Sequence, residues 1–298
     1  MIWAHPGRVK GQSGTRLAAH RPHGDRGGVT LSSSTPDALW ASRSVHMLQP
    51  AAVVCDGISR IEHGEPILDD VSLVVEVGAR LLVTSQPEET ASMLLRLLAG
   101  LSHPTSGSVR LAGVPRSDKS PTGWVRRVGY VGPEAGIYSW MTPREVLDLA
   151  GRIAEYDSRD RARRIDALAE RYRFGGLLDE PVRRGSEPLA QRVALAAAML
   201  SDPEILLLNE PLRAVDPDER RQLLTIPGSR RTVLIASRYP ASEAGLVDHV
   251  ALLRDGHLVV HAPVAELDSR GLTLSLRGIE ALAEPGGLAP PANAAGNE

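Results

Sequence analysis

One stretch, residues 83–101 with the sequence VTSQPEETASMLLRLLAGL, most constrains what this chain can fold into. It follows a short apolar strand predicted over residues 80–83, and its polar turn leads into an apolar helix that continues over residues 94–101. A buried strand that turns directly into a helix is typical of layered α/β domains. The stretch therefore predicts a strand, a turn and a helix in direct succession.

The turn stands where a phosphate-binding loop of the pattern G-x-x-x-x-G-K-[ST] would lie. That pattern presents bare backbone N–H groups and a lysine to the phosphates. Here Ser85 and Thr90 occupy the two glycine positions and Ala91 occupies the lysine position. Only Ser92, at the position of the Mg-ligating hydroxyl, fits the pattern.

Four segments around this turn occur in a fixed order. They are ILDDVSLVVEVG, LLRLLAGLSHPTSGSVRLAG, LSDPEILLLNEP and TVLIASRYPASEAGLVDHVALLRDGHLV. Together they resemble the ATP-binding-cassette domain of ABC transporters over roughly residues 52 to 265. The resemblance implies a P-loop NTPase-like core sheet with an antiparallel β subdomain and a small inserted helical subdomain. The segment MTPREVLDL resembles, more weakly, the exporter-type cassettes of drug and antibiotic efflux systems.

The resemblance divides the chain into three parts. Residues 51–283 are expected to form the nucleotide-binding domain, with the helical subdomain at about 139–190. Residues 1–50 show no sustained apolar period and predict a disordered extension without a secretory signal, and Met47 as the true start is a further hypothesis. Residues 284–298 are rich in Pro, Gly, Ala and Asn and predict a disordered tail.

Short segments predict four local features. HGEP predicts a turn between the first two strands, and the DG of VALLRDGHLVV predicts a hairpin turn. Thr142 opens a capped helix with Pro143 at its first position and Glu145 at the capping-box position. A charged helix, SRDRARRIDALAERY, follows it.

Composition limits the partners. A net charge of −2 argues against a dedicated nucleic-acid binder. The single Cys55 excludes an internal disulfide framework and fits a reducing compartment. No apolar run approaches the roughly 18 residues that span a bilayer, so another chain would supply a membrane span. The expected location is cytoplasmic, peripheral to the inner face of the membrane.

Further positions of the family's nucleotide site also carry other residues. Pro133 stands where the resemblance implies a glutamine that ligates Mg and senses the γ-phosphate. Ser186 keeps its place in the signature segment, but Glu187 and Pro188 follow it where the family has glycines. A carboxylate and a lost N–H both weaken anion binding there.

The last two positions follow buried strands. Asn209 replaces the aspartate that orders the Mg shell, so Ser92 and Asn209 stand at the metal positions that the resemblance implies, and Glu210 stands at the position of the catalytic base. Arg238 replaces the switch histidine and could bind an anion, but it cannot act as a neutral hydrogen-bond partner.

These losses bear on catalysis together. Phosphoryl transfer depends on positioning and charge neutralisation, and losing one strong electrostatic contact costs about 3 kcal/mol. Glu88 and Glu89 add negative charge beside an anionic ligand. The sequence therefore predicts no ordinary hydrolysis of MgATP, and it leaves open whether ATP and Mg bind at all.

Three functions stay open. The first is a pseudo-ATPase cassette that docks a permease or an active cassette through residues 139–175 and the loop at Asp216, which keeps the family's acidic residue. The second is a stand-alone regulatory or interaction module on the same fold. The third is a slow ATPase that uses Glu210, with Ser92 and Arg238 at the phosphates.

Overall fold

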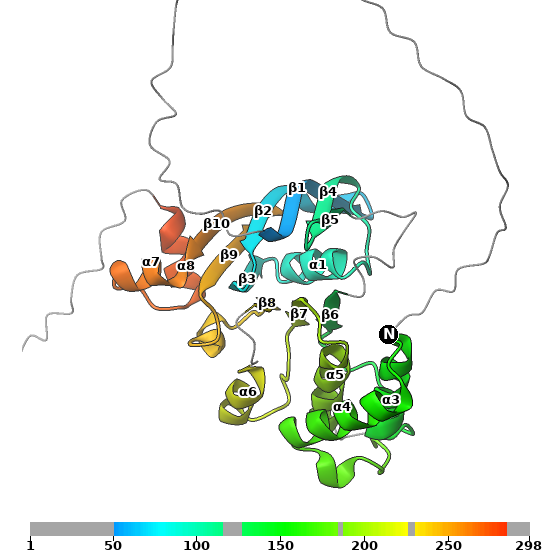
Figure 1. Cartoon of the computed structure of the whole chain (residues 1–298). Coiled ribbons are helices and arrows are strands. Elements are labelled where there is room, and N and C mark those ends of the chain that lie inside the picture. Colours follow the sequence, from blue (N-terminus) through cyan, green and yellow to red (C-terminus); the bar gives the residue numbers. More distant parts are fainter. Residues whose placement is uncertain (1–50, 116–126, 184–186, 226–229, 285–298) are drawn as a thin grey trace, which may run out of the picture. The chain divides into compact units, whose positions relative to one another are not determined.

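The computed structural model describes residues 51–115, 127–183, 187–225 and 230–284 (Figure 1). The disorder predicted for residues 1–50 and 284–298 concerns residues outside these ranges, apart from Glu284. Ser186 also lies outside them.

The first sheet has four antiparallel strands in the order β2-β1-β4-β5. Its strands are β1 (Ala51–Glu62), β2 (Glu65–Glu76), β4 (Ser106–Leu111) and β5 (Val114–Pro115). The predicted turn between β1 and β2 forms at His63 and Gly64, with φ of 52° and 89°. Positive φ at both turn residues matches the twist of the paired strands and closes a tight hairpin.

The second sheet has six strands in the order β10-β9-β3-β8-β7-β6. These are β3 (Arg80–Gln86), β6 (Val128–Val131), β7 (Ile205–Asn209), β8 (Thr232–Ala236), β9 (His249–Arg254) and β10 (His257–Pro263). All neighbours are parallel except β10, which pairs antiparallel with β9 across the predicted Asp255–Gly256 turn. Every residue of β7 and β8 is buried, as expected for parallel strands covered on both faces.

Helices cover both faces of this sheet (Figure 1). Helix α1 (Glu89–Leu98) lies between the two sheets and shares one apolar core with them. On the opposite face a second core packs beneath α3 (Pro143–Ile153), α4 (Ser158–Arg171), α5 (Glu187–Leu200) and α6 (Pro217–Leu224). Helices α7 (Val264–Ser269) and α8 (Leu276–Ala283) pack on β9 and β10. The α/β architecture predicted from the sequence is confirmed.

Two predicted boundaries at the central stretch were wrong. The strand predicted to stop at residue 83 continues to Gln86, so only Pro87 and Glu88 separate it from α1. The helix predicted to continue to residue 101 ends at Leu98, because Gly100 takes a left-handed φ of 77°. The phosphate-loop positions are thereby divided between a strand end and the first turn of a helix.

The inserted helical region begins with the predicted capping box. The Thr142 hydroxyl accepts the Glu145 N–H at 3.2 Å, and the Glu145 carboxylate accepts the Thr142 N–H at 2.9 Å. This confirms that α3 begins after Thr142 with Pro143 as its first residue. The predicted charged helix is α4, and a short 3-10 turn, η1 (Gly175–Leu177), follows it. The subdomain boundaries at about 139 and 190 stay predictions.

Candidate functional site

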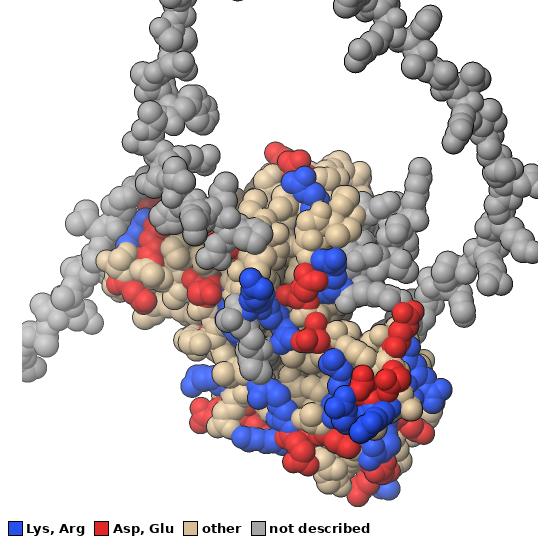
Figure 2. All heavy atoms as spheres, viewed as in Figure 1, with Lys and Arg blue, Asp and Glu red and all other residues tan. Residues whose placement is uncertain are grey.

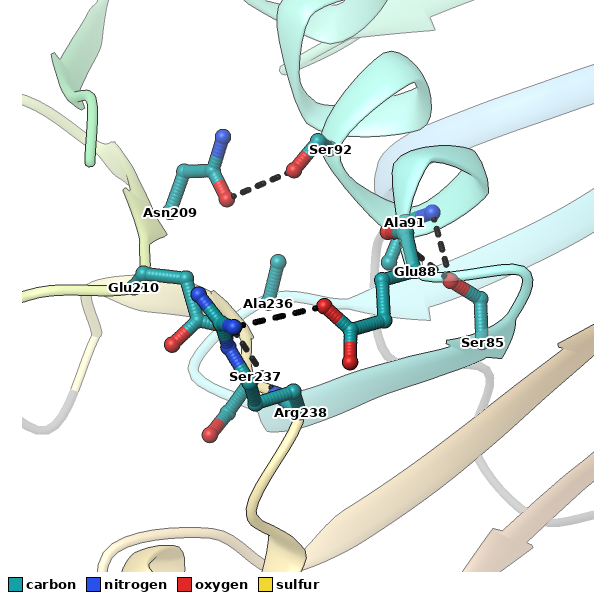
Figure 3. Close-up of a pocket in the computed structure, with 9 residues that line it drawn as sticks. All are labelled: Ser85, Glu88, Ala91, Ser92, Asn209, Glu210, Ala236, Ser237 and Arg238. Atoms are coloured by element: carbon teal, nitrogen blue, oxygen red, sulfur yellow. Dashed lines mark hydrogen bonds and ion pairs between the residues drawn. The ribbon is translucent and has the colours of Figure 1, made fainter.

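A small pocket forms where the carboxyl ends of β3, β7 and β8 meet the start of α1 (Figure 3). Ligands of open parallel sheets bind at this end of the strands. We call this site the phosphate pocket. It is lined by Ser85, Glu88, Ala91, Ser92, Asn209, Glu210, Ala236, Ser237 and Arg238.

The fold brings most of the sequence-predicted positions together. Those that line the pocket are Ser85, Ala91, Ser92, Asn209, Glu210 and Arg238. Thr90 is buried with 1% of its surface exposed and is not a lining residue. Pro133 follows β6 and is also not a lining residue.

Two backbone donors at the turn before α1 bond to acceptors of the same turn. The Ser85 hydroxyl accepts the Ala91 N–H at 2.9 Å and donates to the Pro87 carbonyl at 2.7 Å. The Thr90 N–H donates to the same carbonyl at 3.3 Å. Two N–H groups that a phosphate-binding loop would offer to a ligand are therefore paired within the chain.

The two predicted metal positions are bonded to each other. The Ser92 hydroxyl donates to Asn209 Oδ1 at 3.0 Å, and Asn209 Nδ2 donates to the Tyr130 hydroxyl at 3.4 Å. Asn209 is 2% exposed, and its amide brings no negative charge. Burial raises the pKa of the Tyr130 hydroxyl, outweighing the bond from Asn209, so this group also stays neutral. The oxygens that would face a magnesium ion form an uncharged hydrogen-bonded chain.

Arg238 occupies the other side of the pocket, between two carboxylates (Figure 3). Its guanidinium lies 3.4 Å from Glu88 Oε2 and 3.6 Å from Glu210 Oε1. Its backbone N–H also donates to Glu210 Oε1 at 2.8 Å. The Glu210 backbone is held at φ 49° while its N–H donates to the Ala236 carbonyl at 3.0 Å. The predicted base is therefore bonded to the residue at the switch position.

These contacts leave little space. The cavity has a volume of about 10 Å³, close to the minimum that holds one water molecule, about 10–15 Å³. A nucleotide triphosphate with its magnesium ion needs free N–H donors, a lysine and a charged metal ligand. The N–H groups of Thr90 and Ala91 are paired, Ala91 stands in place of the lysine and Asn209 is uncharged, so the described residues do not fit MgATP.

Sequence reasoning missed two features of the described chain. One is Tyr130 on β6, whose hydroxyl accepts a hydrogen bond from Asn209 on the neighbouring strand β7. The other is a pair of stacked rings, Tyr138 and Trp140, with centroids 5.5 Å apart and an interplanar angle of 13°. These side chains are 67% and 68% exposed. Two aromatic residues two positions apart, in a chain with only 3% aromatics, were the available signal. We call them the aromatic pair.

The aromatic pair lies directly before α3, and more apolar side chains are exposed nearby in the chain. These are Leu149 and Ile153 on α3 and Leu177 in η1.

The charged residues of this helical region are mostly paired, as in Arg144–Asp179 at 2.6 Å. Figure 2 shows acidic and basic side chains intermixed over α3 and α4 on the face in view. That face offers no single-sign field for a nucleic acid. Among the described helices, none is both long and apolar enough to cross a bilayer.

Comparison with known proteins places the chain in a family. The family model described as "ABC transporter" matches residues 68–213. The chain is 32% identical to the nickel import ATP-binding protein NikO of Rhodobacter capsulatus over 249 residues, covering 78% of this chain and 97% of NikO. It is 28% identical to an uncharacterized ABC transporter ATP-binding protein of Synechocystis, covering 72% of this chain but only 62% of that relative.

A solved structure shares the fold. The ATP-binding subunit of an ABC transporter aligns with a TM-score of 0.69 at 21% identity, over 78% of this chain and 99% of that subunit. Three observations point to the same family: the order of the strands, the position of the pocket at their carboxyl ends, and the identity with NikO over nearly its whole length. This chain belongs to the family of ATP-binding cassette subunits of ABC transporters.

Proposed function

We propose that this cassette subunit docks a membrane permease or an active cassette and does not hydrolyse ATP. The observation that carries the proposal is Arg238, paired with Glu88 and Glu210 in a cavity of about 10 Å³. Phosphates could enter only if these ion pairs broke.

Electrostatics support the exclusion of ATP. The first turn of α1 is the positive end of the helix dipole, which would attract phosphate in an ordinary cassette. Here Glu88 precedes that turn and Glu89 lies within it. Like charges at 4 Å repel by about 4 kcal/mol at an effective dielectric constant of about 20. Ala91 stands in place of the lysine, and Arg238, the one basic side chain among the described residues that line the pocket, is already paired with Glu88 and Glu210.

Glu210 favours one competing function, a slow ATPase, because it lines the pocket at the position of the catalytic base. Its carboxylate is bonded to Arg238, and the loop that should position the phosphates lacks its lysine. We therefore expect Glu210→Gln to leave any residual rate of the purified chain unchanged. A rate that falls by roughly two orders of magnitude in this variant would favour the ATPase instead.

The aromatic pair supports the docking part of the proposal. Exposed, rigid aromatic side chains beside apolar ones are typical anchors of protein interfaces. Tyr138 and Trp140 lie at the start of the helical region, within or beside the predicted docking segment 139–175. The Asp216 loop, the second predicted contact, uses its carboxylate as the cap of α6, accepting the Asp218 N–H at 3.0 Å. The aromatic pair is therefore the stronger candidate for the interface.

The relatives bear on the direction of transport and support a membrane permease as the partner. NikO is named an import ATP-binding protein, whereas the segment MTPREVLDL favours export. Transport direction thus stays a prediction. In either direction a permease would provide the membrane span, and the cassette would lie at its cytoplasmic face.

Equilibrium binding of MgATP to the purified chain tests the first half of the proposal. We expect no saturable heat in calorimetry up to millimolar nucleotide and no rise in the melting temperature. A ligand present at 100 times its Kd would stabilise the fold by about 2.7 kcal/mol, an easily measured shift. Saturable binding by both methods would contradict the proposal.

Purification of the tagged chain from detergent-solubilised native membranes tests the second half. We expect a polytopic membrane protein or a second cassette to purify with it in stoichiometric amount. Recovery of neither, at a chain concentration well above its native level, would favour a stand-alone module.

A further inference from the structure

Arg238 connects three segments that are distant in sequence. Glu88 directly precedes α1, Glu210 directly follows β7, and Arg238 itself follows β8. The parallel pairing of β3 with β8 and of β8 with β7 brings these ends to one edge of the sheet. Figure 3 shows the guanidinium lying between the two carboxylates.

Charge balance inside the phosphate pocket depends on this one side chain. Among its nine lining residues, Glu88 and Glu210 are acidic and only Arg238 is basic. Glu210 is 18% exposed, so much of its carboxylate is withdrawn from water. Without Arg238, two carboxylates would share the pocket with no countercharge from its lining, which is unfavourable at reduced solvation.

We propose that Arg238 acts as an internal counter-ion in place of a nucleotide and its metal. Through Glu88 and Glu210 it forms a latch that holds the start of α1 against the ends of β7 and β8 in the absence of ligand. This inference rests on the proposed function and extends it, because it says what keeps the empty site closed. The subunit then presents one fixed conformation to its partner, independent of nucleotide.

The chemistry of arginine fits this role. A guanidinium carries five N–H donors in a planar fork and can meet two carboxylates at once, which a lysine ammonium does less well. The backbone N–H of the same residue adds a third contact, at 2.8 Å to Glu210. The Arg238 side chain is 38% exposed and Glu88 is 64% exposed, so salt screens the outer pair more than the inner one.

A double-mutant cycle on the full chain tests the latch. Arg238→Met should lower the melting temperature by about 2–4 °C. Glu210→Gln or Glu88→Gln should lower it in the native background but change it little in the Arg238→Met background, because the partner is already gone. Arg238→Lys, which keeps the charge without the fork, should lie between the native chain and Arg238→Met.

Hydrogen exchange gives a readout that general destabilisation would not reproduce. In Arg238→Met, amides of residues 88–91 should exchange roughly five- to tenfold faster, while those of β7 stay protected. The matched control is Arg254→Met, which breaks a half-exposed ion pair with Glu280 at 2.8 Å between β9 and α8. It should leave exchange at residues 88–91 unchanged.

Three outcomes separate the claims. Additive melting temperatures across the cycle, or unchanged exchange at residues 88–91 in Arg238→Met, would overturn the latch and leave the proposed function standing. Saturable MgATP binding to the native chain would overturn the proposed function. The coupled cycle together with faster exchange confined to the start of α1 would support the latch.

Discussion

The phosphate pocket and the aromatic pair contrast in how their side chains are satisfied. In the pocket, polar groups bind one another: Ser92 binds Asn209, and Arg238 lies between two carboxylates. In the aromatic pair, two large rings stack on each other and present most of their surface to solvent. A ligand at the pocket would replace existing contacts, whereas a partner at the rings would bury unpaired apolar surface.

The two regions therefore differ in how much free energy the binding of a ligand or partner can release. Burying apolar surface contributes roughly 25 cal/mol per Å². Exchanging one set of ion pairs and hydrogen bonds for another contributes little net free energy. The aromatic pair is thus the favourable place for an interaction, and the pocket favours internal order. Four predictions test this contrast.

The largest effect on stability is expected at a buried ion pair outside the pocket. This pair serves as the reference against which the ion pairs of the pocket are compared. Arg220 meets Glu243 at 2.7 and 3.2 Å, and the two side chains are 12% and 0% exposed. Arg220→Ala would leave a buried carboxylate unpaired and should lower the free energy of unfolding by about 3–5 kcal/mol. Urea denaturation measures it. Replacing both residues, as Arg220→Met with Glu243→Leu, should recover most of the lost stability. A smaller loss of stability in Arg220→Ala than in Arg238→Met would contradict the expectation that the buried pair contributes more.

The next effect concerns the exposed rings. Trp140→Ala should weaken binding of the co-purifying partner by about 2 kcal/mol, roughly thirtyfold in Kd, and leave the melting temperature unchanged. The measurement is a titration of immobilised chain against solubilised membranes. Tyr239, which is 64% exposed and also aromatic, is the matched control. Equal losses in Trp140→Ala and Tyr239→Ala would mean that the rings contribute only non-specific adhesion.

A smaller effect is expected at the cap that joins the aromatic pair to its helix. Thr142→Ala removes the side-chain acceptor of the Glu145 N–H and should cost about 1 kcal/mol of stability. Thermal unfolding measures this cost, and Thr142→Ser should restore most of it. If the cap also fixes the direction of the rings, Thr142→Ala should weaken partner binding modestly. Unchanged stability would show that tertiary packing alone sets the start of α3.

The smallest expected effect is a pH dependence of stability that arises outside the phosphate pocket and the aromatic pair. It must be separated from any pH dependence that arises within them. Burial, followed by the neighbouring His249, lowers the pKa of His261 on β10. The unfolded chain takes up this proton near pH 6.5 and the folded chain only at lower pH. Stability is therefore full above about pH 6.5 and declines as the pH falls through the folded pKa. Urea unfolding at pH 7.5 and 5.5 should show a shallower decline in His261→Gln than in the native chain; equal declines would assign the effect elsewhere.

Much of the fold followed from signals between residues a few positions apart. The capping box at Thr142 and the left-handed turns at Gly64 and Gly256 form where the sequence predicts them, because each depends on adjacent backbone groups. The apolar runs of β7 and β8 likewise predict buried parallel strands. The helix end near Gly100 was misplaced, because a glycine shows that a helix can stop but does not fix the residue at which it does.

From the sequence alone it follows that residues of the family's nucleotide site are replaced, and in what order they occur. What the replacements do depends on how distant segments meet in three dimensions. Asn209 lies 117 positions from Ser92 and 79 from Tyr130, yet it bonds both because strand order brings β6, β7 and α1 together. From the sequence, Arg238 could bind an anion; in the structure its guanidinium is held by Glu88 and Glu210. Side-chain partners of this kind depend on how distant strand ends meet, which is set by burial of the shared core and not by local sequence.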